Sequence, residues 1–162
     1  MIPIVSIVGK SDAGKTTLIE KLIPELKRRG YRVATIKHDA HQFDIDRPGK
    51  DSYRHFLAGA DWTIIGSPDK IASVRRLERE LTLDEIAAQI DSVDLILTEG
   101  YKREAHHRIE VSRRARTTEL ISQPEELLAI AADYPIEAAV PVYDLNDVAG
   151  LVDLIEHELL KK

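Results

Sequence analysis

Ile4-Val5-Ser6-Ile7-Val8-Gly9-Lys10-Ser11-Asp12-Ala13-Gly14-Lys15-Thr16-Thr17 is the stretch that decides the fold. It matches G-x-x-x-x-G-K-[ST], with an apolar run before it and a helical pattern after it, which is the context that a phosphate-binding loop (P-loop) requires. The two glycines let the loop bend tightly, so that backbone N–H groups point at phosphate oxygens. We expect Lys15 to contact the β- and γ-phosphates, and the following helix to direct its positive end at the same phosphates.

The Thr16 hydroxyl stands where this motif places a Mg²⁺ ligand. We therefore predict that nucleotide phosphates are bound by Gly9, Lys10, Ser11, Asp12, Ala13, Gly14, Lys15, Thr16 and Thr17.

Length and composition indicate one ordinary globular domain over residues 1–162. The chain has no Cys, which excludes a disulfide framework and a thiolate metal site and is compatible with the cytoplasm that we expect. No apolar run approaches the ~18 residues of a membrane span. The net charge of −5 gives no reason to expect nucleic acid, and aromatic residues for base stacking are few, at 5%.

Strand and helix patterns alternate along the chain. Strands are predicted at residues 2–8, 33–36, 61–66, 70–77, 93–98, 108–112, 127–132 and 140–142, and helices at 15–29, 50–58, 82–90 and from Asn146 or Asp147 onward. Thr82 and Glu85 form a capping box at one helix start, and Gly30 is a C-terminal cap. This alternation predicts an α/β fold: a single P-loop NTPase domain with a mainly parallel sheet flanked by helices.

Acidic residues that follow strands are candidates for the Mg²⁺ site. Glu99 closes the apolar strand at residues 93–98, and Asp39 lies just past the second strand. Mg²⁺ requires oxygen ligands, and open α/β sheets bind ligands at the carboxyl ends of their strands. We predict Thr16, Asp39 and Glu99 as metal-site residues, and Lys15 and Glu99 as catalytic residues.

Other polar residues leave two readings open. Asp44 and Asp46 are either metal ligands or turn residues, and His38 and His41 are either a metal pair or polar loop residues. A basic stretch is either a solvated surface or an anion or partner site: Lys102, Arg103, His106, His107, Arg108, Arg113, Arg114 and Arg116.

Beyond the P-loop, several blocks resemble the molybdopterin-guanine dinucleotide biosynthesis protein B family (MobB). The similar blocks are Thr35-Ile36-Lys37-His38-Asp39, the run from Phe43 to His55, Leu97-Thr98-Glu99-Gly100-Tyr101-Lys102, Ile109-Glu110-Val111 and Tyr143-Asp144-Leu145-Asn146-Asp147-Val148. They occur in the family's order over nearly the whole chain, and the run from Phe43 to His55 is far more specific than the P-loop alone.

The resemblance implies a GTP-binding homodimer with weak GTPase activity and an accessory role in molybdenum cofactor biosynthesis. It implies a partner, the MobA-type guanylyltransferase that attaches GMP to molybdopterin, and molybdopterin as a further ligand. It also implies that residues 44–53 sense a ligand. The sequence has no Asn-Lys-x-Asp guanine-reading element. Asp133, at the end of the strand 127–132, is a candidate to accept from guanine N1 and N2. Lys10 either reaches a partner's nucleotide or is an ordinary loop lysine.

Three functions are consistent with these residues. The first is a GTP-binding accessory protein with slow Mg²⁺-dependent hydrolysis, because no water-positioning Gln and no arginine finger can be identified. The second is a small-molecule kinase in which Glu99 or Asp39 is the base and the basic stretch closes as a lid. The third is a structural partner in which the nucleotide only holds the fold or the dimer together.

Overall fold

A computed structural model describes residues 1–39, 43–102 and 107–160. The chain divides into two compact units. We call Met1–His38 together with Thr82–Lys162 the sheet unit, and Asp39–Leu81 the hairpin unit. Each unit is described by itself.

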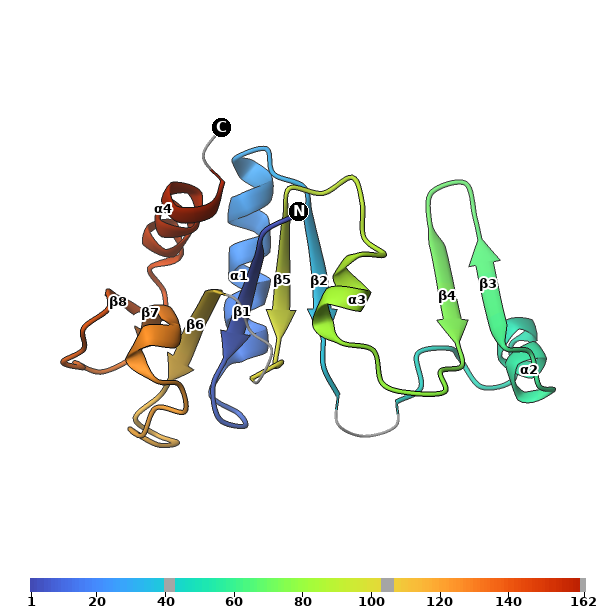
Figure 1. The fold of residues 1–162 in the computed structure, drawn as a ribbon, viewed down its shortest axis with the longest axis horizontal. Coiled ribbons are helices and arrows are strands. Elements are labelled where there is room, and N and C mark those ends of the chain that lie inside the picture. The colour runs from blue at the N-terminus through green and yellow to red at the C-terminus, as the bar shows by residue number, and fades with distance from the viewer. Residues whose placement is uncertain (40–42, 103–106, 161–162) are drawn as a thin grey trace. The chain divides into compact units, whose positions relative to one another are not determined.

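The sheet unit is built on six parallel strands in the order β2-β5-β1-β6-β7-β8 (Figure 1). The strands are β1 Ile4–Val8, β2 Val33–Lys37, β5 Leu95–Glu99, β6 His107–Ser112, β7 Leu127–Ala132 and β8 Val142–Asp144. The prediction of a mainly parallel sheet flanked by helices is confirmed. The strand predicted at 140–142 begins and ends two residues later, as β8.

The sheet unit also contains helices, and signals in the sequence explain several of their ends. They are α1 Lys15–Arg28, α3 Leu83–Ala87, the 3₁₀ turn η1 Pro124–Glu126, and α4 Val148–Leu159. Two residues after the end of α1 lies Gly30, whose φ is +91°, and the Tyr31 N–H donates to the Leu26 carbonyl at 3.1 Å. The capping box of Thr82 and Glu85 forms as predicted, but α3 is shorter than the predicted 82–90.

Both faces of the sheet are buried, which is why its strands read as continuous apolar runs. On one face, α1 and α4 pack over β1, β5, β6 and β7 in the larger core cluster, with Leu22 of α1 and Ile155 of α4 fully buried. On the other face, Leu83 of α3 packs with Ile4, Ile36 and Ile96. The carboxyl ends of the strands therefore carry the residues that are free to form a site.

The hairpin unit consists of α2 Asp51–Leu57 and an antiparallel pair of strands, β3 Trp62–Gly66 and β4 Ile71–Arg75. The strands predicted at 61–66 and 70–77 exist, but they form a separate two-stranded sheet and do not extend the parallel one. The physical reason is the short connection, in which the Ser67 N–H donates to the Lys70 carbonyl at 2.8 Å. Such a turn joins antiparallel neighbours, whereas parallel strands need a long crossover.

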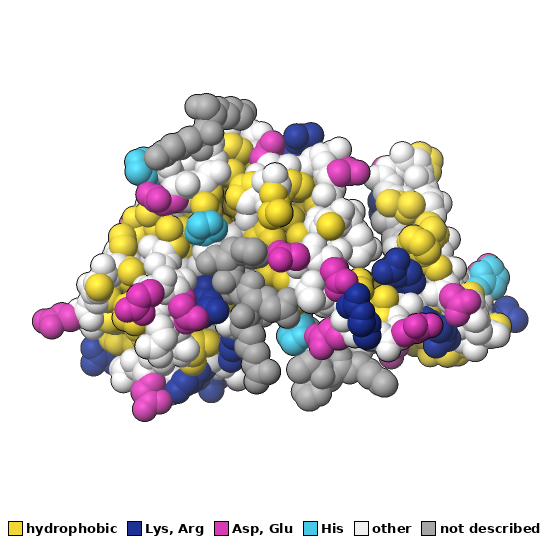
Figure 2. All heavy atoms as spheres, in the orientation of Figure 1, with side chains coloured by type: hydrophobic (Ala, Val, Ile, Leu, Met, Phe, Trp, Pro, Cys, Tyr) yellow, Lys and Arg dark blue, Asp and Glu magenta, His cyan; other side chains and the backbone are white. Residues whose placement is uncertain are grey.

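The two faces of this hairpin differ. Directly paired residues share a face, so Trp62, Ile64 and Ile71 lie on one side, and Thr63 and Val74 on the other. The first three side chains are more than half exposed. Figure 2 shows hydrophobic side chains on the surface of β3 and β4.

Candidate nucleotide-binding site

The P-loop between β1 and α1 has the backbone that its glycines predict. Gly9 and Gly14 have φ values of +147° and +100°, and Asp12 is also left-handed. A Cβ atom on Gly9 would lie 2.5 Å from the Val111 carbonyl oxygen of β6, so any side chain there would push the loop off the sheet. The first N–H groups of α1 have no intrahelical partners and are available to an anion.

Lys15 folds back over the loop. Its Nζ donates to the carbonyl oxygens of Gly9 at 3.1 Å and Lys10 at 2.9 Å. Burial lowers the pKa of Lys15, against the opposing effect of the Glu99 carboxylate. Burial disfavours an ammonium group that has no charged partner. A phosphate brought into the loop would therefore be stabilised by the Lys15 ammonium, and would stabilise it in turn.

Thr16 and Glu99 are in direct contact. The Thr16 Oγ1 donates to Glu99 Oε1 at 2.8 Å, although the two residues are 83 positions apart. Glu99 stands at the end of β5, where it pairs with Ile7 of β1 on one side and Lys37 of β2 on the other. The structure thus brings two of the three predicted Mg²⁺-site residues together at the mouth of the loop.

The donor set at this point fits a hard divalent cation. Mg²⁺ is bound through one or two protein oxygens together with phosphate oxygens and water, and Thr16 and Glu99 supply such oxygens. Among the described residues there is no group of three or more His, Asp or Glu side chains arranged to hold a metal ion. A magnesium site completed by nucleotide phosphates does not need such a group.

The remaining carboxylate candidates for the metal belong to the hairpin unit. Asp39 is exposed and is the first residue of the hairpin unit, which also holds Asp44 and Asp46. The Asp46 carboxylate accepts from the N–H of Arg47 at 2.8 Å, as a turn residue does. His38 packs its ring against Tyr101 at 4.8 Å, and His41 lies outside the described residues.

Residues that follow β6 contact the P-loop, and these contacts were not predicted from the sequence. Lys10 Nζ donates to Glu119 Oε2 at 3.0 Å, and Arg116 lies 3.7 Å from the Asp12 carboxylate. Lys10 therefore pairs within its own chain in this structure. No local pattern could have predicted Glu119, because its partner is 109 positions away.

A pocket of about 200 Å³ opens beside the loop. Gly14 of the P-loop and Thr17 and Lys21 of α1 line it on one side, and Asp133, just after β7, lines it on another. Its further polar wall is Asn146, whose Oδ1 accepts from Lys21 Nζ at 2.8 Å. The predicted residue Asp133 is thus at this pocket. Sequence reasoning missed Lys21, although it lies four residues after Thr17 and hence on the same helix face.

Asp133 is held by its neighbours. Its Oδ1 accepts from the Arg114 N–H at 2.8 Å, and its Oδ2 lies 3.6 Å from the Arg113 Nε. Arg113 also lines the pocket. A carboxylate fixed in this way keeps accepting lone pairs for a ligand, since each oxygen can take more than one hydrogen bond.

The basic stretch does not act as one surface. Arg108 is buried and ion-paired with Glu126 at 2.5 Å, whereas Arg114 lies over the Tyr134 ring and Arg113 reaches the pocket. His107 is exposed at the start of β6. Arg103 and His106 lie outside the described residues. Among the described residues, no helix combines the length and apolar character needed to cross a membrane.

Comparison with known proteins gives the same family from sequence and from structure. The family model for molybdopterin guanine dinucleotide synthesis protein B matches residues 4–133. The molybdopterin-guanine dinucleotide biosynthesis adapter protein of Escherichia coli (strain K12) is 40% identical over 169 residues, covering 100% of this chain and 96% of that relative. The adapter protein of the same name from Haemophilus influenzae is 39% identical over 160 residues, covering 98% and 90%.

Solved structures agree. A crystal structure of molybdopterin-guanine biosynthesis protein B is 32% identical, with a TM-score of 0.76 over 98% of this chain and 99% of that one. The crystal structure of Bacillus subtilis MobB is 26% identical, with a TM-score of 0.79 over 99% and 100%. A P-loop with Thr16 against Glu99, on a parallel sheet shared with these proteins, completes the identification: the chain belongs to the molybdopterin guanine dinucleotide synthesis protein B (MobB) family.

Proposed function

We propose that this protein is a GTP-binding accessory protein of molybdenum cofactor biosynthesis, which assists a guanylyltransferase in forming molybdopterin guanine dinucleotide. The single observation that carries the nucleotide part is the 2.8 Å contact between Thr16 and Glu99 at the mouth of the P-loop. The adapter role is supported by the names of the relatives that cover nearly the whole chain.

In this proposal the loop residues change partners when nucleotide binds. Lys15 leaves the carbonyl oxygens of Gly9 and Lys10 and donates to the β- and γ-phosphates, where its charge is better compensated. Thr16 and Glu99 would hold a Mg²⁺ ion, which supplies neutralisation of the phosphate charge. Asp39 belongs to the same metal-site proposal, as a further carboxylate.

Hydrolysis would be slow. Lys15 and Glu99 are the proposed catalytic residues, but they position phosphate and metal and do not orient the attacking water. Without a water-positioning Gln or an arginine finger, a P-loop protein turns over slowly until a partner supplies the missing group. This property suits an accessory protein that carries its nucleotide to an enzyme.

The pocket beside the loop is the proposed guanine site. A carboxylate can accept from both N1–H and the N2 amino group of guanine, whereas adenine offers no donor at either position. Asp133 is the carboxylate at that pocket, and its exposed fraction of 34% leaves it accessible to a base. This arrangement supports GTP over ATP.

The first test is calorimetric titration with GTP and ATP, each with and without Mg²⁺. We expect Mg²⁺-dependent binding of GTP at least ~10-fold tighter than ATP, which corresponds to about 1.4 kcal/mol. Lys15→Ala should abolish this binding, and Lys27→Ala, at an exposed position of the same helix, should leave it unchanged. Equal or tighter binding of ATP, with rapid turnover on a small acceptor, would replace the proposal with a kinase.

A base-specific test uses Asp133→Asn. An amide can donate to the O2 oxygen of xanthine, where guanine carries an amino group, so the variant should lose GTP affinity and gain affinity for xanthosine triphosphate. Loss of affinity for both nucleotides would show that Asp133 only holds Arg113 and Arg114 in place.

The proposal includes partners. We propose a homodimer formed through the exposed apolar face of the hairpin unit, at Trp62, Ile64 and Ile71. The MobA-type guanylyltransferase is the proposed enzyme partner, with its substrate molybdopterin as a further ligand of the complex. We also propose the cytoplasm as its location, since a GTP-binding accessory protein would need access to cytoplasmic GTP. Co-purification with the transferase, compared between wild type and Lys15→Ala, tests whether the complex depends on nucleotide.

A further inference from the structure

The proposed guanine site has an acceptor, Asp133, but no donor has yet been assigned to it. Guanine presents donors at N1 and N2 and an acceptor at O6, whereas adenine carries an amino group at position 6. A site that hydrogen-bonds one edge of a base rejects an analogue whose groups are reversed there, because polar groups of the site are then left unpaired. Full recognition of guanine therefore requires a donor beside Asp133 that meets O6.

Asn146 stands at the right place in the fold for this donor. Strands β7 and β8 are parallel neighbours, with Ala132 paired to Asp144, so the residues that follow them leave the sheet side by side. The Leu145 N–H donates to the Ala132 carbonyl at 3.2 Å, which holds the segment after β8 against the end of β7. Asp133 and Asn146 consequently line the same pocket from adjacent strand ends.

The turn that carries Asn146 is fixed by its own hydrogen bonds. The Asn146 N–H donates to Asp144 Oδ1 at 2.8 Å, and the Asp147 N–H donates to the Asp144 carbonyl at 2.9 Å. Asp147 then caps α4, because its Oδ1 accepts from the Gly150 N–H at 3.0 Å. A side chain carried on such a turn needs little further ordering of the backbone when a ligand binds, which favours a role in recognition.

Lys21 fixes the orientation of the Asn146 amide. Its Nζ lies 2.8 Å from Asn146 Oδ1. Because an ammonium group can only donate, the amide oxygen is the atom turned towards Lys21, and the amino group Nδ2 is turned away from it. Within residues 1–39, 43–102 and 107–160, no group accepts a hydrogen bond from Nδ2. Both of its N–H donors therefore remain for a ligand or for water.

The pocket has the size and the walls of a site for a base. Its volume of about 200 Å³ is below the roughly 300–1,000 Å³ of sites that hold whole drug-sized ligands. Leu18 and Leu145 supply apolar walls, and Gly14 of the P-loop lines the pocket on the phosphate side. A purine whose phosphates are held by the P-loop would place its flat faces against the leucines and its edge against Asp133 and Asn146.

We propose, building on the guanine site proposed above, that Asn146 is a specificity residue for nucleotides with a carbonyl oxygen at position 6 of the purine. Its Nδ2 donates to O6 while Asp133 accepts from N1 and N2, so that the two residues read complementary groups on the same edge. Lys21 is a positioning residue, which holds the amide so that Nδ2 and not Oδ1 meets the base. Adenine would bring its own amino group against Nδ2, and two donors would face each other.

Calorimetric titration with GTP, 6-thio-GTP and ITP, each with Mg²⁺, separates the two contacts. 6-Thio-GTP replaces only O6, by a sulfur that accepts weakly, and ITP lacks only the amino group at position 2. The wild type should bind GTP about fivefold tighter than 6-thio-GTP, the size of one neutral hydrogen bond. Asn146→Ala should remove most of this preference, while the preference for GTP over ITP, which belongs to Asp133, persists. An Asn146→Ala variant that kept the wild-type preference for GTP over 6-thio-GTP would overturn the proposal.

Gln89→Ala is the matched control, since it removes an exposed amide of the sheet unit that does not line the pocket. It should leave every affinity unchanged. Tripolyphosphate with Mg²⁺ reports on the P-loop without a base, and it should bind Asn146→Ala and wild type equally. Weaker tripolyphosphate binding in Asn146→Ala would reduce Asn146 to a structural role and overturn the proposal.

The same titrations separate failure of the proposed function from failure of the role of Asn146. A wild type that binds tripolyphosphate, and ATP as tightly as GTP, contradicts guanine recognition itself and the role of Asn146 with it. A wild type that prefers GTP, with Asn146→Ala behaving like Gln89→Ala, contradicts the role of Asn146 alone.

Lys21→Met tests the positioning role. The methionine keeps much of the length of the side chain but cannot donate, so the Asn146 amide is free to turn, and the preference for GTP over 6-thio-GTP should fall by about threefold. Lys21→Arg, which also only donates, should restore the preference. If Lys21→Met removed the preference and Asn146→Ala did not, Lys21 itself would be the donor to O6, and the proposal would be overturned.

Discussion

The sheet unit and the hairpin unit differ in how far they bury their hydrophobic side chains. Every hydrophobic side chain that is fully buried among the described residues belongs to the sheet unit, including Leu22, Leu97 and Ile155. The hairpin unit instead exposes Phe43, Ile45, Leu57, Trp62, Ile64, Ile65, Ile71 and Leu77. An isolated two-stranded hairpin with one short helix has too little apolar burial to be stable on its own. The sheet unit therefore carries the stability, and the hairpin unit depends on contacts beyond its own residues.

The largest expected difference comes from one substitution made in each unit. Leu22→Ala, in the core under α1, should lower the free energy of unfolding by about 2–5 kcal/mol, because it opens a cavity where the side chain has no exposed surface. Leu57→Ala, at a leucine of α2 that is 64% exposed, should change it by less than about 0.5 kcal/mol. Urea denaturation measures both. A loss of equal size in the two variants would show that the hairpin unit has a core of its own.

The next prediction concerns the apolar face of the hairpin. Neighbouring positions of β3 point to opposite faces, so Ile64→Lys alters the proposed dimer face and Ile65→Lys the opposite face of the hairpin. Ile64→Lys should weaken dimerisation by about 100-fold, which corresponds to about 2.7 kcal/mol. Ile65→Lys should change it by no more than about threefold. Sedimentation velocity over a concentration series decides the matter, and dimers unaffected by Ile64→Lys would place the interface elsewhere.

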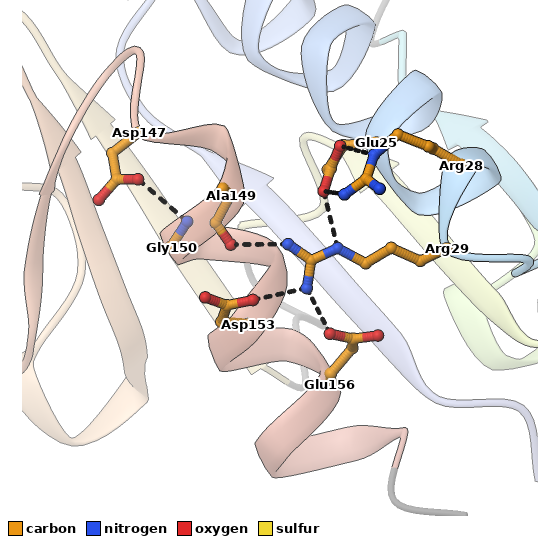
Figure 3. Close-up of polar contacts among 8 residues, drawn as sticks. All are labelled: Glu25, Arg28, Arg29, Asp147, Ala149, Gly150, Asp153 and Glu156. Carbon is orange, nitrogen blue, oxygen red and sulfur yellow. Dashed lines mark hydrogen bonds and ion pairs between the residues drawn. The ribbon is translucent and has the colours of Figure 1, made fainter.

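The contacts of arginine side chains also differ between the two units, in how far apart along the chain their partners lie. In the sheet unit, Arg29 of the α1 C-terminus binds Glu25 at 2.7 Å and, across to α4, Asp153 at 2.5 Å and Glu156 (Figure 3). In the hairpin unit, Arg76 donates to the Phe56 and Ala60 carbonyl oxygens and lies over the Phe56 ring. Arg29 thus joins α1 to residues of α4 that are more than 120 positions away, whereas Arg76 joins residues at most 20 positions apart.

These two arginines give the third prediction. Arg29→Ala should lower the free energy of unfolding by about 1–3 kcal/mol, because it leaves several carboxylates together around a side chain that is only 16% exposed. Arg76→Ala should change it by about 0.5 kcal/mol or less, while amide hydrogen exchange in α2 becomes faster. If hydrogen exchange in α1 and α4 were faster than in α2 after Arg76→Ala, the two units would be coupled.

Features that neighbouring residues encode could be predicted from the sequence. The P-loop, the capping box at Thr82 and the strand ending at Glu99 are each encoded by neighbouring residues, and the structure places Thr16 against Glu99. The resemblance to the MobB family is confirmed by relatives and solved structures.

Other features depend on contacts that no local pattern encodes. Lys10 with Glu119, and Lys21 with Asn146, are more than 100 positions apart, and only the sheet order brings them together. The two strands of the hairpin were predicted, but their antiparallel pairing with each other was not. Apolar residues occur in these strands as they do in the core strands, and the short turn at 67–70 is what pairs the two strands with each other.

The smallest effect is a dependence on pH in the sheet unit. Hydrogen bonds from Arg28 and Arg29 lower the pKa of Glu25 from 4.5 to about 2. A carboxyl group whose folded pKa is lowered stabilises the fold above its unfolded pKa, and this stabilisation is lost as the pH falls through the folded pKa. The difference in unfolding free energy between wild type and Glu25→Gln should therefore be constant above about pH 5 and should shrink between about pH 4.5 and 2. Urea titrations at intervals across this range measure it. If this free-energy difference did not change with pH, the ion pairs of Glu25 in Figure 3 would persist equally in the unfolded chain. The link between α1 and α4 would then rest on apolar packing.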